Sequence, residues 1–332
     1  MSRPNYDAMR GRDLLRMMER IRAFERAAEQ AAIRDGLVLG AIHLSIGQEA
    51  CAAGIMRALR RDDLLLSTHR GHGHTLAKGA DPEAMMRELL GREGGSCGGK
   101  GGSMHIADFG VGMLGANGVV SANITIGAGA AHGIKLLGDD RIVVDVFGDG
   151  AINRGPFLEG LNWAAVFDLP VLFVCEDNEW SATTRTADMT AGPGAAARAR
   201  SFGLHVEEVD GNDAEAMADA AAALVARVRD GRSPAFLHAR TFRQGGHTYF
   251  DPAAYRPAEE AQARIDADDP IARQRDVLAA AGVAEKEMDA LRREAAAEMA
   301  GALKAAAAAP FPDPVTAFTD VQNIGSPERR AF

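Results

Sequence analysis

The sequence lacks most features of secreted, membrane-bound and nucleic-acid-binding proteins. Only three of its 332 residues are cysteines, and the spacing of Cys51, Cys97 and Cys175 fits neither a zinc cluster nor a disulfide framework. We therefore expect reduced thiols in a cytoplasmic protein. Acidic residues outnumber basic ones by 46 to 37, and the net charge of −9 argues against nucleic acid as the main partner.

Long apolar runs are missing as well. No stretch approaches the roughly 20 residues that a helix needs to cross a bilayer, so we expect no membrane contact. The N-terminal segment has no apolar core like that of a signal peptide, and its acidic residues Asp7, Asp13, Glu19 and Glu25 are untypical of a transit peptide. We also find no internal repeat and no linker. A chain of this length can bury a large core as one big domain or two smaller ones.

Short apolar runs alternate with helical patterns through most of the chain. This alternation is typical of an α/β protein with a mostly parallel sheet and helices on both faces. An amphipathic pattern at about 13–34 predicts an N-terminal packing helix, and the alanine-rich stretch at about 258–309 predicts a helical C-terminal extension. The expected strands are 64–67, 142–147, 171–175, 204–209 and 234–239.

The stretch Arg141–Thr184 combines a strand, a glycine turn, a helix, a second strand and a polar loop. Asn153 stands where the third glycine of a dinucleotide-binding G-x-G-x-x-G motif would fall, which argues against a nicotinamide cofactor. Asp149 and Asn178 could each be a plain turn residue. Their joint occurrence after two consecutive strands is better explained by a shared site at one edge of the sheet.

Oxygen ligands at this edge predict a magnesium–diphosphate site. Mg²⁺ prefers octahedral oxygen ligands and usually takes few from protein and the rest from phosphates and water. The Asp149 carboxylate, the Asn178 carboxamide and a main-chain carbonyl near Trp180 would supply the protein ligands. The main-chain N–H groups of Gly150 and Ala151 lie near an expected helix start, where they can face a diphosphate oxygen.

Thr68–His74 follows the first expected strand and contains three histidines and an arginine. A zinc site is one interpretation, but no nearby carboxylate or thiolate completes a ligand set. A solvated basic patch at a helix start is another. Anion binding fits better, because the Arg70 guanidinium offers a rigid fork of donors and the glycines expose main-chain N–H groups.

Two glycine-rich stretches precede the central unit. Seven of the twelve residues Gly91–Gly102 are glycines, which predicts a long loop, either ordered at a site or disordered. Gly115–Ser121 predicts a second turn, before a helix at 124–137 whose small residues suit close packing within the chain or at a subunit interface. His247 follows the last expected strand, where ligands of parallel sheets gather. His43, taken alone, is more simply explained as a structural histidine.

Together these segments resemble the alpha subunit of the thiamine-diphosphate-dependent decarboxylase component of 2-oxo acid dehydrogenase complexes, and within that group the pyruvate and acetoin types. The likeness runs from about His43 to beyond His247, and the order and spacing of the segments make it specific. The matching segments are His43–Ala50, Arg70–Gly73, Lys100–His105, Gly118–Val120, Gly148–Ala151 with Asn153 and Gly155, Asp177–Asn178, Asp210–Gly211, and Arg243 with Gly246–His247.

The resemblance implies a thiamine-diphosphate-binding fold, a single domain over 1–332, and specific roles for the matching residues. Asp149, Asn178 and the Trp180 carbonyl would ligate Mg²⁺. His43 and His247 would be the catalytic residues in the pocket where a 2-oxo acid reacts. The other implied contacts are Arg70, Gly150, Ala151 and His247 with the diphosphate, His69, Gly118 and Val120 with the rest of the cofactor, and Ser103, Met104 and His105 near the entrance of the substrate pocket.

The sequence departs from the family pattern at several of these positions. His69 stands where relatives often have a tyrosine against the cofactor, and Asp177 and Trp180 stand where asparagine and tyrosine are usual. Asn178, the implied metal ligand, is retained. The departures therefore affect the expected identity of the substrate more than that of the cofactor.

The resemblance implies an alpha subunit that uses thiamine diphosphate and Mg²⁺ to decarboxylate a 2-oxo acid and to pass the acyl group to a lipoyl carrier. An acetoin dehydrogenase alpha subunit that cleaves acetoin is the alternative. In this family a glutamate that ionises the cofactor comes from a separate beta subunit, which this chain does not resemble. We therefore expect an α₂β₂ heterotetramer that works with a lipoyl-bearing acyltransferase. A non-catalytic partner subunit that keeps the fold is the alternative of a different class.

Overall fold

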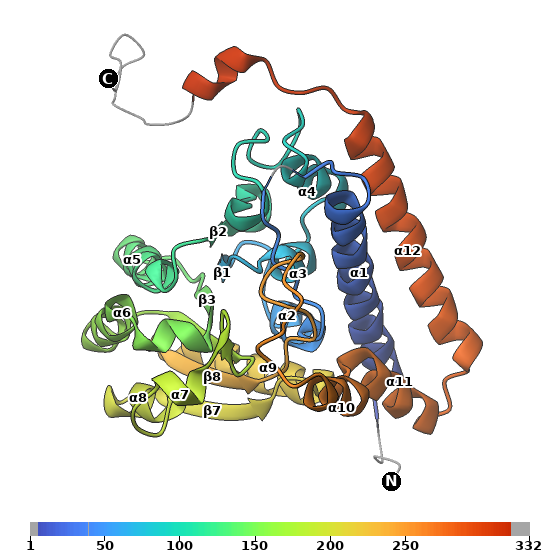
Figure 1. Ribbon diagram of the computed structural model, residues 1–332. Coiled ribbons are helices and arrows are strands. Elements are labelled where there is room, and N and C mark those ends of the chain that lie inside the picture. Colours follow the sequence, from blue (N-terminus) through green and yellow to red (C-terminus); the bar gives the residue numbers. More distant parts are fainter. Residues whose placement is uncertain (1–5, 39, 320–332) are drawn as a thin grey trace.

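A six-stranded parallel sheet forms the centre of the molecule (Figure 1). The computed structural model describes residues 6–38 and 40–319, so both limits of the expected domain, 1 and 332, lie outside the described residues. Neighbouring strands follow the order β2-β1-β3-β4-β8-β7, and every pair in this sheet is parallel. The strands are β1 Leu64–Thr68, β2 Met113–Asn117, β3 Val143–Gly148, β4 Val171–Asp177, β7 His205–Asp210 and β8 Ala235–Arg240.

Helices cover both faces of the sheet, which confirms the predicted α/β class. Side chains alternate between the two faces along a strand. In β3, Val143 and Phe147 pack against α5, α6 and α8, whereas Val144 and Val146 face the core formed with α1, α2 and α9 (Figure 1). The helices are α1 Ala8–Ile33, α2 Glu49–Arg57, α3 His72–Ala77, α4 Pro82–Leu89, α5 Ala122–Leu137, α6 Gly155–Val166, α7 Thr186–Met189, α8 Ala195–Ser201, α9 Ala214–Gly231, α10 Ala258–Asp268, α11 Pro270–Ala280 and α12 Glu285–Ala308.

Local chemistry sets the ends of the long terminal helices. α1 begins before the expected residue 13, because the Asp7 carboxylate accepts hydrogen bonds from the N–H groups of Met9 and Arg10. The helical extension expected at about 258–309 is divided into α10, α11 and α12, with Gly282 at a φ of 85° between the last two. α12 then runs along α1 (Figure 1).

The turn predicted at Gly115–Ser121 is partly wrong. Gly115 lies in β2, the edge strand of the sheet, which neighbours β1 in the strand order and meets the loop residues Ile106 and Asp108 on its other side. Glycine weakens a strand interior, but an edge position tolerates it because no second strand of the sheet has to pair with it. The sequence pattern of glycines therefore hid one of the six strands.

Cys51, Cys97 and Cys175 are all free, as expected for reduced thiols. Within residues 6–38 and 40–319, none of the helices combines the length and the apolar character that crossing a bilayer requires.

The glycine-rich loop Gly91–Gly102 is ordered around one buried carboxylate. Glu88, at the end of α4, is completely buried, and its two side-chain oxygens accept main-chain N–H groups of the loop. An ionised carboxylate forms strong hydrogen bonds of this kind. The loop is therefore built around an anion that the chain itself supplies. The donors are Cys97 at 2.7 Å, Gly99 at 2.8 Å, Gly101 at 2.7 Å and Gly102 at 3.1 Å.

Replacing Glu88 by glutamine is expected to lower the free energy of unfolding by about 2–5 kcal/mol, because the amide has no negative charge and turns an N–H₂ group toward loop donors. Urea unfolding would measure the loss. Glu83→Gln on the same helix is the control, since Glu83 is only half-buried and pairs with Arg87 one turn away. We expect a change within about 0.5 kcal/mol there. Equal effects of the two substitutions would contradict the structural role of Glu88.

Candidate active site

A cavity of about 170 Å³ lies where the carboxyl ends of the central strands meet. Because the strands are parallel, the residues that follow β1, β2, β3, β4 and β8 all reach the same edge of the sheet. The cavity therefore collects side chains from segments far apart in the sequence. Of the residues predicted from the sequence, those that line it are His69, Arg70, Val120, Asp149, Gly150, Ala151, Asn178, Trp180 and His247.

Asp149 and Asn178 lie side by side because β3 and β4 are in register, with Gly148 opposite Glu176. Asp149 is buried, and this burial, together with the charge of Asp177, raises its pKa to about 6. A carboxylate and a carboxamide oxygen are thus available at one edge of the cavity. Both belong to the ligand types that Mg²⁺ prefers.

A short ribbon of β5 (Trp180–Ser181) and β6 (Thr184–Arg185) borders these two residues. The Trp180 N–H donates to the Asn178 side-chain oxygen at 3.2 Å, and the Thr186 hydroxyl donates to the Asp149 carboxylate. Gly150 leaves no room for a larger residue, because the Ser181 side chain occupies the space of a Cβ. The ribbon and the first residue of α7, Thr186, therefore fix both oxygen-bearing side chains from one side.

Two buried guanidinium groups give the cavity a positive charge. Arg70 donates to the carbonyls of Leu44 at 2.8 Å and His247 at 2.7 Å, and Arg243 donates to the Ala182 carbonyl at 2.9 Å. Among the described residues, neither forms an ion pair with a carboxylate. Burial, and then the charge of Arg243, lower the pKa of Arg70 to about 9, and burial lowers that of Arg243. Buried cations without a partner are costly, so this cavity favours an anionic ligand.

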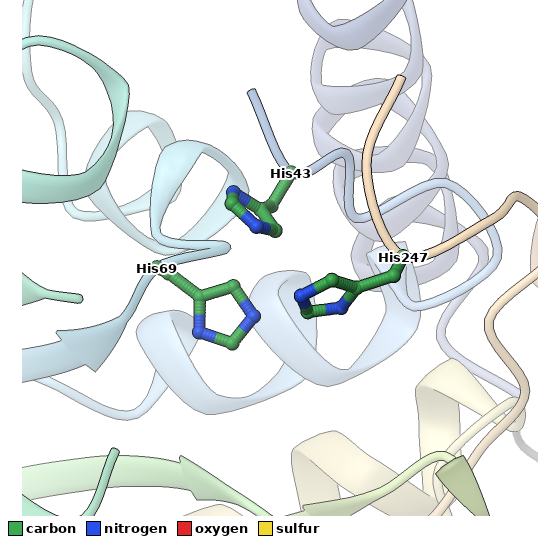
Figure 2. Close-up of side chains that lie close together, drawn as sticks. All are labelled: His43, His69 and His247. Carbon is green, nitrogen blue, oxygen red and sulfur yellow. The ribbon is translucent and has the colours of Figure 1, made fainter. Parts of the chain in front are cut away.

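Three histidines meet at the side of the cavity (Figure 2). The ring centroid of His43 lies 4.6 Å from that of His69 and 4.8 Å from that of His247, and the other two are 5.6 Å apart. Burial, and then the charge of Arg70, lower their pKa values to about 3 for His43, about 2 for His69 and about 4 for His247. All three rings are therefore neutral near pH 7.

Main-chain pairing brings these histidines together. The segment before α2 and the segment after β8 are joined by hydrogen bonds from Gln244 N–H to the Ile46 carbonyl and from Tyr249 N–H to the Ile42 carbonyl, both 3.2 Å.

The contact with Arg70 determines the tautomer of His247, because the guanidinium approaches Nδ1 of this ring at 3.2 Å. Because a guanidinium only donates, Nδ1 accepts and the neutral ring carries its proton on Nε2.

A buried polar network holds the side chain of Asn178 in place. Its amide donates to the Gln48 side-chain oxygen at 2.9 Å, and the Gln48 amide lies 3.4 Å from Glu176. Glu176 also pairs with His74 at 2.9 Å, whose other ring nitrogen contacts Ser67 at 2.9 Å. This network fixes the Asn178 carboxamide with its amide toward Gln48. Its side-chain oxygen remains on the other side, at the Trp180 N–H.

Only part of the expected anion-binding segment Thr68–His74 lies at the cavity. Arg70 and His69 line the cavity, but His72 is fully buried between Glu25 at 2.9 Å and Ser103 at 2.8 Å. His74 belongs to the Glu176 network. Two of the three histidines are therefore structural, because α3 turns them into the core.

The segment that carries Ser103, Met104 and His105 lies outside the cavity lining. Its short 3₁₀ turn packs on Gly118, where a Cβ would lie 3.3 Å from the His105 ring and 3.7 Å from the Met104 sulfur. Ser103 faces His72 instead of the cavity. His43 is also outside the lining, but it contacts His69 and His247, which belong to it.

Comparison with known proteins gives a consistent result. The family model described as dehydrogenase E1 component matches residues 16–315. The chain belongs to this family. Membership of the E1 family implies thiamine diphosphate as the cofactor. The names of its relatives include a subunit designation, which points to a partner beta subunit in the E1 component.

Relatives of two named activities cover most of the chain. The alpha subunit of acetoin:2,6-dichlorophenolindophenol oxidoreductase from Cupriavidus necator is 43% identical, over 92% of each chain. Its counterpart from Bacillus subtilis is 41% identical over 77% of this chain and 76% of the relative. The pyruvate dehydrogenase E1 component subunit alpha of Rhizobium meliloti is 36% identical over 92% of this chain and 88% of the relative.

Sequence reasoning gave no site role to three residues that the fold brings to this E1-family cavity. Arg243 supplies the second buried cation, and Gln48 and Glu176 line the cavity and support Asn178. Gln48 and Arg243 lie in segments that matched the family, which was the available signal. Glu176 looked like one more polar residue at a strand end, and only the sheet register turns it toward Gln48.

Proposed function

We propose that this chain is the alpha subunit of a thiamine-diphosphate-dependent E1 enzyme that decarboxylates a 2-oxo acid and transfers the acyl group to a lipoyl carrier. One observation carries the proposal: Arg70 and Arg243 are buried without a carboxylate partner in the described chain, in the cavity that also holds Asp149 and Asn178. A diphosphate would neutralise the cations, and a metal ion would join it to the two oxygen ligands.

The proposed metal is Mg²⁺, held by Asp149, Asn178 and the Trp180 carbonyl. The donor chemistry supports this choice, because carboxylate, carboxamide and main-chain oxygens suit a hard cation. The main chain beside Trp180 is held in place, because the Thr186 N–H donates to the carbonyl of Glu179, the preceding residue, at 3.0 Å. Gly150 and Ala151 follow Asp149 at the cavity wall, where their N–H groups are proposed to meet the diphosphate.

Thiamine diphosphate, when bound, supplies the nucleophilic carbon and the electron sink that loss of carbon dioxide requires. The chain's own part is to orient the reactants and to hold or move protons. His247 can donate a proton from Nε2, because Arg70 donates a hydrogen bond to its Nδ1 and the ring proton is therefore on Nε2. His43 offers Nδ1, which is buried and has no hydrogen-bond partner in the described chain. We assign these two histidines to proton positioning at the reacting group.

The beta subunit is proposed to cover the open side of the cavity and to form an α₂β₂ heterotetramer. Val120 lines the cavity yet is 46% exposed, and the neighbouring Val119 is 62% exposed. Apolar side chains at the rim of an anion site are unfavourable in water and favourable under a second subunit. The contacts of Gly118 and Val120 with the aminopyrimidine, the Ser103–His105 entrance, the lipoyl-bearing acyltransferase and the cytoplasmic location stay predictions.

Turnover is expected only when the chain is combined with its beta subunit. Full-length chain with Mg²⁺ and thiamine diphosphate should give no lipoyl-coupled turnover of pyruvate, because the group that ionises the cofactor lies on the other subunit. Adding the beta subunit should start turnover, measured by lipoyl reduction. A cofactor titration with and without Mg²⁺ separates the alternatives. No cofactor binding even with the beta subunit would identify a non-catalytic partner, and turnover by the lone chain would overturn the heterotetramer.

Acetoin cleavage is the second candidate function, because the relatives of 41% and 43% identity are named as alpha subunits of an acetoin:2,6-dichlorophenolindophenol oxidoreductase. The assembled pair should be assayed with pyruvate, branched 2-oxo acids and acetoin at equal concentrations. Carbon dioxide release distinguishes the first two from acetoin, which is cleaved without it. The substrate with the highest kcat/KM decides between the candidates.

A further inference from the structure

We propose that His43, His69 and His247 form a second metal-binding site, at the side of the same cavity that holds Asp149 and Asn178, and that it binds a divalent transition-metal ion of the Zn²⁺ type. Each ring offers one nitrogen, and these three nitrogens lie within 4.8 Å of one another. Figure 2 shows the rings facing a common space, although they come from three different segments. Three imidazole ligands with an open fourth position form a familiar arrangement for zinc.

The protonation state of the cluster suits a metal ligand set. A histidine must be neutral to bind a metal, so protons normally compete with the ion. Here burial and Arg70 keep the three rings neutral near pH 7, which removes that competition. His43 is 6% exposed, and its Nδ1 has no hydrogen-bond partner within the described residues. A buried acceptor of this kind gains a partner when a metal ion binds.

Arg70 and Arg243 limit how strongly the three histidines can bind a metal ion. Ligation through Nε2 of His247 moves its proton to Nδ1 and releases the Arg70 contact there, while Arg70 keeps the carbonyls of Leu44 and His247. The positive charge of Arg70 and Arg243 also opposes a bare cation. An anion such as hydroxide or chloride is therefore the expected fourth ligand. We expect a reversible site and not a permanent structural one.

The donor set separates this site from the proposed Mg²⁺ site. Imidazole nitrogens favour Zn²⁺, Co²⁺, Ni²⁺ and Cu²⁺, whereas Mg²⁺ prefers oxygen. The oxygen ligands Asp149 and Asn178 follow β3 and β4, while the histidines belong to the segments around β1, α2 and the loop after β8. Excess Mg²⁺ should accordingly not displace the transition metal.

Occupation of this site is expected to inhibit the enzyme. A metal ion on His43 and His247 withdraws the ring nitrogens that the proposed function uses for proton positioning. A chelator should restore activity by removing the ion. This inhibition rests on the proposed function, whereas metal binding to the chain does not.

The test is a titration of the purified chain with Co²⁺, monitored by the visible absorption of four-coordinate Co²⁺. Mg²⁺ is present throughout in excess, at about 5 mM, so that the oxygen ligands are not available to Co²⁺. We expect saturable binding, displaced by Zn²⁺. His69→Gln should weaken the affinity by at least about tenfold, because loss of a direct ligand costs no less than loss of a supporting residue. His43→Gln gives a second, independent measurement of the same loss.

His205→Gln is the matched control, since His205 lies exposed on the edge strand β7 and pairs with the exposed Glu207 at 3.4 Å. It should leave the Co²⁺ affinity unchanged. The proposal is overturned if the unaltered chain gives no four-coordinate spectrum, or if both His69→Gln and His43→Gln bind Co²⁺ as tightly as it does. Failure of the beta-subunit assay with intact Co²⁺ binding would count against the proposed function alone.

Discussion

Asp149→Asn is expected to abolish Mg²⁺-dependent cofactor binding and to lower turnover of the assembled enzyme by about a thousandfold. The substitution keeps the size of the side chain but removes the only charged group among the proposed metal ligands. Loss of a charged metal ligand is worth several kcal/mol, and about 4 kcal/mol corresponds to a thousandfold change. Thiamine diphosphate titrations at several Mg²⁺ concentrations would measure the affinity, and steady-state kinetics the turnover.

Asp177→Asn is the matched control for this experiment. Asp177 lies next to Asn178 and undergoes the same change of charge, but its carboxylate pairs with His238 at 2.8 Å and lies outside the cavity lining. We expect a change in cofactor affinity of less than about threefold, typical of a charge that is not a direct ligand. If Asp149→Asn behaved like this control, Asp149 would not be a metal ligand.

Arg70→Gln is expected to weaken cofactor binding by about 30- to 1000-fold, because it removes one of two buried cations that await the diphosphate. Its effect on the free energy of unfolding should be small, within about 2 kcal/mol. Two contributions oppose each other there: hydrogen bonds to two main-chain carbonyls are lost, and the cost of burying an unpaired charge is relieved. Cofactor titration and urea unfolding of the same variant separate the two effects.

Arg57→Gln provides the comparison for Arg70. Arg57 ends α2, its side chain is 43% exposed, and its ion pair with Asp13 is long at 3.5 Å. Neither cofactor affinity nor stability should change measurably. A large loss of stability with unchanged cofactor affinity in Arg70→Gln would show that Arg70 is structural and does not bind the anion.

The sequence predicted the alternation of strands and helices and most strand positions, since these depend on local apolar patterns. It failed where the local pattern was ambiguous. Gly115 suggested a turn but lies in the edge strand β2, where pairing with β1 outweighs the weak strand propensity of glycine. The glycines of Gly91–Gly102 indicated a loop, but not that Glu88, from the preceding helix, organises it.

The sequence by itself determined the family and the residues at the strand ends, because parallel strands must bring Asp149 and Asn178 to one edge. Only the tertiary structure decided how charge is distributed there. In the tertiary structure His72 and His74 are buried in the core, and Arg70 and Arg243 have no carboxylate partners in the described chain. The same packing places the His43 ring in contact with those of His69 and His247. Pairing and burial depend on contacts between distant segments, and no local pattern of residues encodes them.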